Sequence, residues 1–174
     1  MRWSSLAVLL AALLASPAHA ERLVFDYRDY APLKAVLDSG RTEMIRYDDS
    51  NPKYITDRIA IQGTSVDQWT EALDIIVRLR GSKMRTTADW SRQIERQSRA
   101  LCPSSFTVIA QDANSLTLQR SSTGCPAGTP LTGLYRIVAG KRSLFMLAGL
   151  TMAEMTEPQR QQWLALLATA RLSS

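Results

Sequence analysis

The stretch ITDRIAIQGTSVDQWTEALDIIVRL, residues 55–79, contains two consecutive strand candidates. Apolar side chains recur at even spacing in both halves of the stretch: Ile55, Ile59 and Ile61, then Ile75, Val77 and Leu79. A period of two places such side chains on one face of a strand, against a core. The stretch therefore predicts that the fold is built on a β-sheet.

Three further elements are predicted before this stretch. RLVFDY (22–27) is rich in aromatic and β-branched residues, which favour a strand. YAPLKAVLDSG (30–40) indicates a helix, because Pro32 suits a first turn and Gly40 suits a stop. TEMIRY (42–47) is another strand candidate.

The pattern after residue 85 changes to that of a helix, TTADWSRQIERQSRAL (86–101). Thr86 suits the N-cap, and Asp89 in the first turn favours the positive helix end. Three apolar residues share one face by their spacing and are predicted to pack on the sheet: Trp90, Ile94 and Leu101.

Two hairpins and a helix are predicted for the rest of the chain. FTVIAQDANSLTLQRSS (106–122) turns at residues 112–114, and LTGLYRIVAGKRSLFMLAGLT (131–151) turns at Gly140 and Lys141. In the last helix Thr156 and Gln159 fit a capping box, and one face carries Trp163, Leu167 and Ala170. The element order predicts the α+β class, a mostly antiparallel sheet flanked by helices, as a single domain over residues 21–174.

Residues 55–79 also resemble a stretch of small exported bacterial proteins with the α/β/α sandwich of Mog1 and the photosystem II PsbP protein. The resemblance covers most of residues 41–172. It implies that Gly63 permits the turn and that Trp69, Thr70 and Glu71 open the central strand. The resemblance implies the fold much more than a function, because this fold serves unrelated binding and accessory roles and is not characteristically enzymatic.

The first twenty residues, MRWSSLAVLLAALLASPAHA, have the layout of a secretory signal peptide. Arg2 precedes an apolar run of ten residues, 6–15, and small residues at Ala18 and Ala20 suit cleavage after Ala20. The run is shorter than the roughly 18–20 residues that span a bilayer. We expect an exported, periplasmic protein without a transmembrane segment.

Export favours a disulfide between Cys102 and Cys125, the only two cysteines of the chain. A redox pair would more naturally have Cys-x-x-Cys spacing, which is absent. A zinc site would need further Cys or His ligands, and the only histidine, His19, lies within the predicted signal peptide. We therefore predict a structural disulfide, no metal and no cofactor. The bridge would hold the end of the 86–101 helix against the first hairpin.

Positive charge is concentrated in residues 78–99, which hold seven basic and two acidic side chains. Residues 21–77 instead have a net charge of −4, so the sequence predicts a basic face opposite an acidic one. The candidate binding residues are Arg85, Arg92, Arg96 and Arg99. Nucleic acid does not suit an exported domain, and we expect an acidic protein or an anionic envelope component. A solvated helix face is the alternative.

No motif for histidine-based nucleophilic catalysis, phosphate binding or dinucleotide binding occurs after residue 20. Glu71 and Asp74 are the notable carboxylates, but a spacing of three on a strand sends them to opposite faces. Trp69 is a candidate surface aromatic beside a glycine turn. The leading hypothesis is a non-catalytic binding or accessory protein of the cell envelope. An immunity-type inhibitor of a periplasm-acting toxin is the alternative, followed by a carboxylate-based hydrolase.

Overall fold

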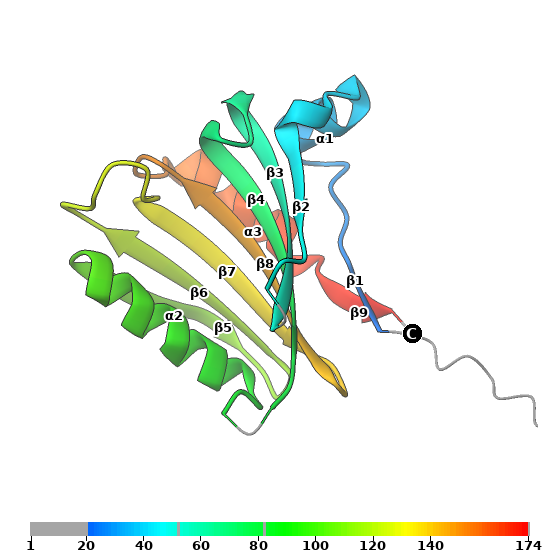
Figure 1. Cartoon of the computed structure of the whole chain (residues 1–174), viewed down its shortest axis with the longest axis vertical. Helices are drawn as coiled ribbons and strands as arrows, with labels where there is room; N and C mark the ends of the chain where they lie inside the picture. The colour runs from blue at the N-terminus through cyan, green and yellow to red at the C-terminus, as the bar shows by residue number, and fades with distance from the viewer. Residues whose placement is uncertain (1–20, 52, 82, 174) are drawn as a thin grey trace, which may run out of the picture.

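The computed structural model describes residues 21–51, 53–81 and 83–173. Its centre is a seven-stranded antiparallel sheet with the order β2-β3-β4-β8-β7-β6-β5, and a two-stranded sheet pairs β1 with β9 (Figure 1). The strands are β1 (Arg22–Val24), β2 (Ile45–Asp48), β3 (Tyr54–Ser65), β4 (Gln68–Leu79), β5 (Ser104–Gln111), β6 (Ser115–Ser122), β7 (Thr132–Ala139), β8 (Ser143–Thr151) and β9 (Arg171–Ser173). The helices are α1 (Ala31–Ser39), α2 (Thr87–Leu101) and α3 (Glu157–Ala168).

This architecture confirms the α+β class with a mostly antiparallel sheet. Two elements were not predicted, the 3-10 turn η1 (Thr42–Met44) before β2 and the terminal strand β9. The first strand is also shorter than predicted and ends at Val24. The predicted signal peptide, residues 1–20, lies outside the described residues. Within the described ranges, no helix is both long enough and apolar enough to cross a membrane.

The β3–β4 hairpin joins two strands of twelve residues each. Its register is regular from Tyr54↔Arg78 to Ala60↔Ala72 and then shifts near Gly63. Gly63 has φ +130°, and a Cβ at this position would collide with the backbone of Gln68. Glycine is thus required by the irregular pairing before the turn, because only glycine adopts this conformation readily.

The position of β4 differs from the one implied by the resemblance. β4 begins at Gln68, as expected for a strand opened by Trp69, but it is the third strand of seven and β8 is the central one. The β7–β8 hairpin supplies the centre because it pairs with both β4 and β6.

The two faces of the sheet carry different helices. Glu71 accepts a hydrogen bond from Trp163 of α3, whereas Arg78 donates one to Gln93 of α2. Residues with odd numbers in this part of β4 thus face α3, and those with even numbers face α2. Figure 1 shows α2 and α3 on opposite sides of the sheet. The prediction that Glu71 and Asp74 lie on opposite faces is confirmed.

Helix α2 begins with the predicted cap and differs from the prediction at its end. The Thr86 hydroxyl accepts a bond from the Asp89 N–H while the Asp89 carboxylate accepts the Thr86 N–H, a full capping box. Trp90 and Ile94 are buried as predicted, but Leu101 is 59% exposed. Leu101 lies in the last turn, where the chain turns away toward β5, and the small Ser98 contacts the sheet there instead.

Candidate functional site

The outer face of α2 carries three of the predicted arginines. Arg92, Arg96 and Arg99 are exposed, and their helical positions lie opposite the buried Trp90 and Ile94. Arg85 is exposed just before the helix begins. We call these four residues the basic face: Arg85, Arg92, Arg96 and Arg99.

The carboxylates of α2 neutralise only part of this charge. Asp89 Oδ1 lies 2.6 Å from Arg92, and Glu95 lies 4.0 Å from Arg99. Within the described ranges, Arg85 and Arg96 have no ion pair between side chains. The basic face therefore keeps a net positive charge in contact with solvent.

Asp89 also completes the helix cap. Its carboxylate accepts the backbone N–H groups of Arg85 and Thr86, each at 2.9 Å. The bond from the Arg85 N–H, then those involving Thr86, lower the pKa of Asp89 to about 2. The negative charge of Asp89 thus interacts both with the N-terminus of α2 and with the Arg92 guanidinium.

Arg99 connects the basic face to the edge of the sheet. Its guanidinium lies 5.6 Å from the ring centroid of Phe106, in β5. The Arg99 side chain is 59% exposed, so most of its donors still reach solvent. This cation–π contact holds the Arg99 guanidinium beside β5, the outermost strand of the sheet.

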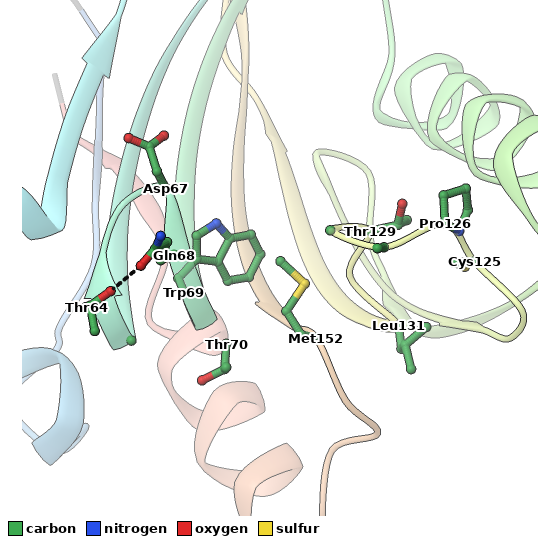
Figure 2. A pocket seen from close by; sticks show the side chains of 13 residues that line it. Thr64, Asp67, Gln68, Trp69, Thr70, Cys125, Pro126, Thr129, Leu131 and Met152 are labelled. Carbon is green, nitrogen blue, oxygen red and sulfur yellow. Dashed lines mark hydrogen bonds between the residues drawn. The ribbon is translucent and has the colours of Figure 1, made fainter.

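A groove of about 680 Å³ lies between the β3–β4 turn and the loop from β6 to β7 (Figure 2). The apolar side chains that line it include Trp69, Leu131 and Met152, and the polar ones include Thr64 and Asp67. Figure 2 shows the Met152 side chain beside the Trp69 indole, with the β6–β7 loop opposite them. No local sequence pattern indicates this groove, because its two walls are about sixty residues apart in the chain.

Trp69 is not the surface aromatic that was predicted. It is only 9% exposed, and the Arg58 guanidinium lies 5.0 Å from its ring centroid. Trp69 nevertheless lines the groove, where Met152 lies beside its indole (Figure 2).

Two interactions hold the groove loop to α2. The predicted disulfide is present, with 1.97 Å between the sulfurs of Cys102, the C-cap of α2, and Cys125 of the loop. The buried Arg120 donates to the Pro130 carbonyl at 2.7 Å and to Ser98 of α2 at 3.3 Å. The basic face and the groove wall therefore belong to one connected unit.

The two carboxylates considered for hydrolysis are both buried in structural contacts. Glu71, 2% exposed, accepts bonds from the Tyr30 hydroxyl and from Trp163 Nε1, the latter at 2.8 Å. Asp74, 5% exposed, accepts two bonds of 2.7 Å from Arg58. Because the two groups lie on opposite faces of the sheet, they do not form the facing pair that glycoside hydrolysis requires.

The tyrosine beside Glu71 is strongly affected by its surroundings. Burial raises the pKa of Tyr30 well above its usual range, and the hydrogen bond to Glu71 and the charge of that residue raise it further. Tyr30 therefore stays protonated and donates to the carboxylate. Within the described residues, no three side chains of the metal-ligating types come together.

Comparison with known proteins finds no family model and no curated protein that matches this chain.

Proposed function

We propose that this chain is a non-catalytic binding or accessory protein of the cell envelope, and that its basic face contacts an acidic partner. The observation that carries the proposal is the exposure of Arg85, Arg92, Arg96 and Arg99 beside only two carboxylates, one of which caps the helix. Concentrated charge of one sign raises association rates with a complementary surface.

The anchoring of α2 supports a binding role for this face. Trp90 and Ile94 pack into the core, the capping box defines the start of the helix, and the disulfide holds its end. The arginines therefore project from a rigid element, so little backbone order is lost when a partner binds.

The disulfide also supports the proposed location. Such bonds persist in oxidising compartments, which agrees with export directed by residues 1–20 and with a periplasmic protein. The finer fold assignment, a Mog1/PsbP-like α/β/α sandwich, is part of this proposal. It is supported by helices on both faces of an antiparallel sheet.

Affinity capture from envelope extract tests the proposal. The baits are residues 21–174, the variant Arg92→Glu/Arg96→Glu/Arg99→Glu, and a control with the same charge change on exposed residues elsewhere, Arg22→Glu/Lys53→Glu/Lys141→Glu. We expect an acidic partner that binds the wild type and the control, is lost from the α2 variant, and is released as salt rises.

Identical partners for all three baits would contradict this role of the basic face. A partner that resists high salt and binds all three baits equally would instead favour the inhibitor hypothesis.

A further inference from the structure

The outer edge of β5 is open to a further strand. β5 is the last strand in the sheet order, and its only pairing within the described residues is with β6. Its sequence, SSFTVIAQ, contains no charged residue and no proline. Edge strands often carry such residues to prevent pairing with other chains, and this edge lacks them, although the register shift between Val108 and Ala110 limits the regular part of the edge to the residues before it.

The register shows which backbone groups point outward. The Thr123 N–H donates to the Pro103 carbonyl at 3.0 Å, so residue 103 directs its carbonyl toward β6. In an antiparallel ladder this direction alternates along the strand. The N–H and C=O groups of Ser104, Phe106 and Val108 therefore point away from β6, before the register shift between Val108 and Ala110.

The side chains at this edge are accessible as well. Val108 is 59% exposed, although it lies on the same face of the sheet as α2. Phe106 is half-buried under the Arg99 guanidinium. An added strand would thus lie about 4.8 Å beyond β5, with one row of its side chains directed toward the flank of α2.

That flank of α2 is positively charged. Gln93 faces the other way, toward β4, where it accepts a bond from Arg78. Arg92 and Arg99 lie on the side of the helix away from Gln93 and the core, and Arg99 reaches β5, whereas Arg96 lies on the outer face three residues after Gln93. Glu95 is the acidic residue on this side, and it is paired with Arg99 at 4.0 Å.

We propose that the outer edge of β5 binds an extended acidic segment of a partner protein as an additional antiparallel strand, with its carboxylates facing Arg99 and Arg92. The main chain of β5 supplies affinity and the arginines select for acidic side chains. This inference rests on the proposed function and specifies the form of the acidic partner. Antiparallel pairing of two β5 edges would bring two basic flanks together, so a second copy of this chain fits less well.

The probe is the peptide acetyl-Glu-Val-Glu-Thr-Glu-Val-Glu-Thr-amide, titrated against residues 21–174 by calorimetry. The key variant is Val108→Pro, which removes an outward N–H that β6 does not use, and the matched control is Val108→Ala. We expect Val108→Pro to weaken binding about tenfold or more, since main-chain hydrogen bonds are lost, and Val108→Ala to change it less than about twofold.

A second version of the test leaves the protein unchanged, in case Val108→Pro impairs folding. In an added strand, the N–H groups of every second peptide residue point toward β5 and the others point away. N-methylation of the residues that point toward β5 removes these donors, whereas N-methylation of the others leaves them intact. We expect two such peptides, methylated in opposite phases, to bind with different affinities, and the peptide with Lys in place of Glu not to bind.

The outcomes separate this inference from the proposed function. Peptide binding that is lost in Arg92→Glu/Arg96→Glu/Arg99→Glu but is unaffected by Val108→Pro and by N-methylation would overturn strand addition and leave the basic face as the site. Absence of binding by the acidic peptide would overturn strand addition, whereas the proposed function fails only if the capture experiment gives identical partners for all three baits. Concentration-dependent dimers in sedimentation that Val108→Pro abolishes, without peptide binding, would identify a second copy as the occupant and overturn the acidic segment.

Discussion

Trp163 Nε1 donates a hydrogen bond of 2.8 Å to Glu71 Oε1, between residues that are 92 positions apart. Trp163 is 0% exposed and Glu71 is 2% exposed, so the contact joins α3 to β4 inside the core. The Tyr30 hydroxyl donates to the same oxygen. A carboxylate at this depth is tolerated because hydrogen bonds compensate for the lost hydration.

Removal of this acceptor is expected to destabilise the protein. Glu71→Ala leaves the Trp163 and Tyr30 donors buried without a partner, and we expect a loss of about 3 kcal/mol in the free energy of unfolding. Glu71→Gln retains an acceptor oxygen, so we expect a smaller loss in the free energy of unfolding. Urea denaturation monitored by tryptophan fluorescence measures both variants. Equal stability of Glu71→Ala and the wild type would show that the network contributes nothing.

The packing of α3 on β8 depends on Gly149. A Cβ at this position would come within about 2.5 Å of the Trp163 ring, and that ring cannot move because it is fully buried. We expect Gly149→Ala to cost about 1–3 kcal/mol, since overpacking shifts the backbone or the indole. Gly81→Ala is the control, because a Cβ there meets open space. Similar thermal midpoints for the two variants would refute the packing argument.

Acid should weaken the start of α2 through Asp89. Hydrogen bonds from the Arg85 and Thr86 backbone lower the pKa of Asp89 from 3.8 to about 2 in the folded protein. A lowered pKa stabilises the fold above the unfolded value, and this contribution is lost as pH falls from about 4 toward 2. Asp89→Asn does not titrate, so we expect the stability gap between the wild type and this variant to narrow over that range.

The comparison with Asp89→Asn is needed because another carboxylate titrates in the same window. Hydrogen bonds with Arg28 lower the pKa of Asp26 to about 2 as well. Chemical denaturation of both proteins at several pH values between 7 and 2 isolates the effect of Asp89. A gap that stays constant with pH would contradict the capping role of its charge.

The disulfide is expected to stabilise the groove wall in particular. Replacing Cys102 and Cys125 by serine removes a cross-link that is worth about 3 kcal/mol by the loop-entropy model. Faster hydrogen exchange is expected at the amides of Thr129 and Leu131, which bond to Pro126 and Thr151 in the structure. The β7–β8 hairpin serves as the internal reference. A uniform increase across both regions would mean that the bridge stabilises only the fold as a whole.

Much of the fold could be predicted because its signals are local. The capping residues Thr86 and Asp89 lie three positions apart, and the hairpin turn near Gly140 lies between two strands that pair directly. The Cys102–Cys125 pairing needed only a count of cysteines and an expectation of compartment. In each case the interacting groups are close in sequence or are the only ones of their kind.

The predictions that the structure contradicts concern residues whose surroundings are formed by segments distant in the sequence. Leu101 fits the apolar face of α2 by its spacing, but the helix ends there and leaves it 59% exposed. Trp69 is preceded by turn residues and suggested exposure, but the surrounding chain buries it. The groove unites residues from the β3–β4 turn and the β6–β7 loop, and no local pattern indicates that meeting.

The sequence by itself determined the order of the elements from β1 to α3 apart from η1, the α+β class, the capping of α2 and the concentration of positive charge in residues 78–99. Periodicity, turn residues and charge are properties of short segments. Only the tertiary structure decided that β8 lies at the centre, that Glu71 meets Trp163 and Tyr30, and that Arg99 lies over Phe106 beside an open strand edge. Those relationships depend on strand register and helix placement, which follow from packing the whole chain around one core.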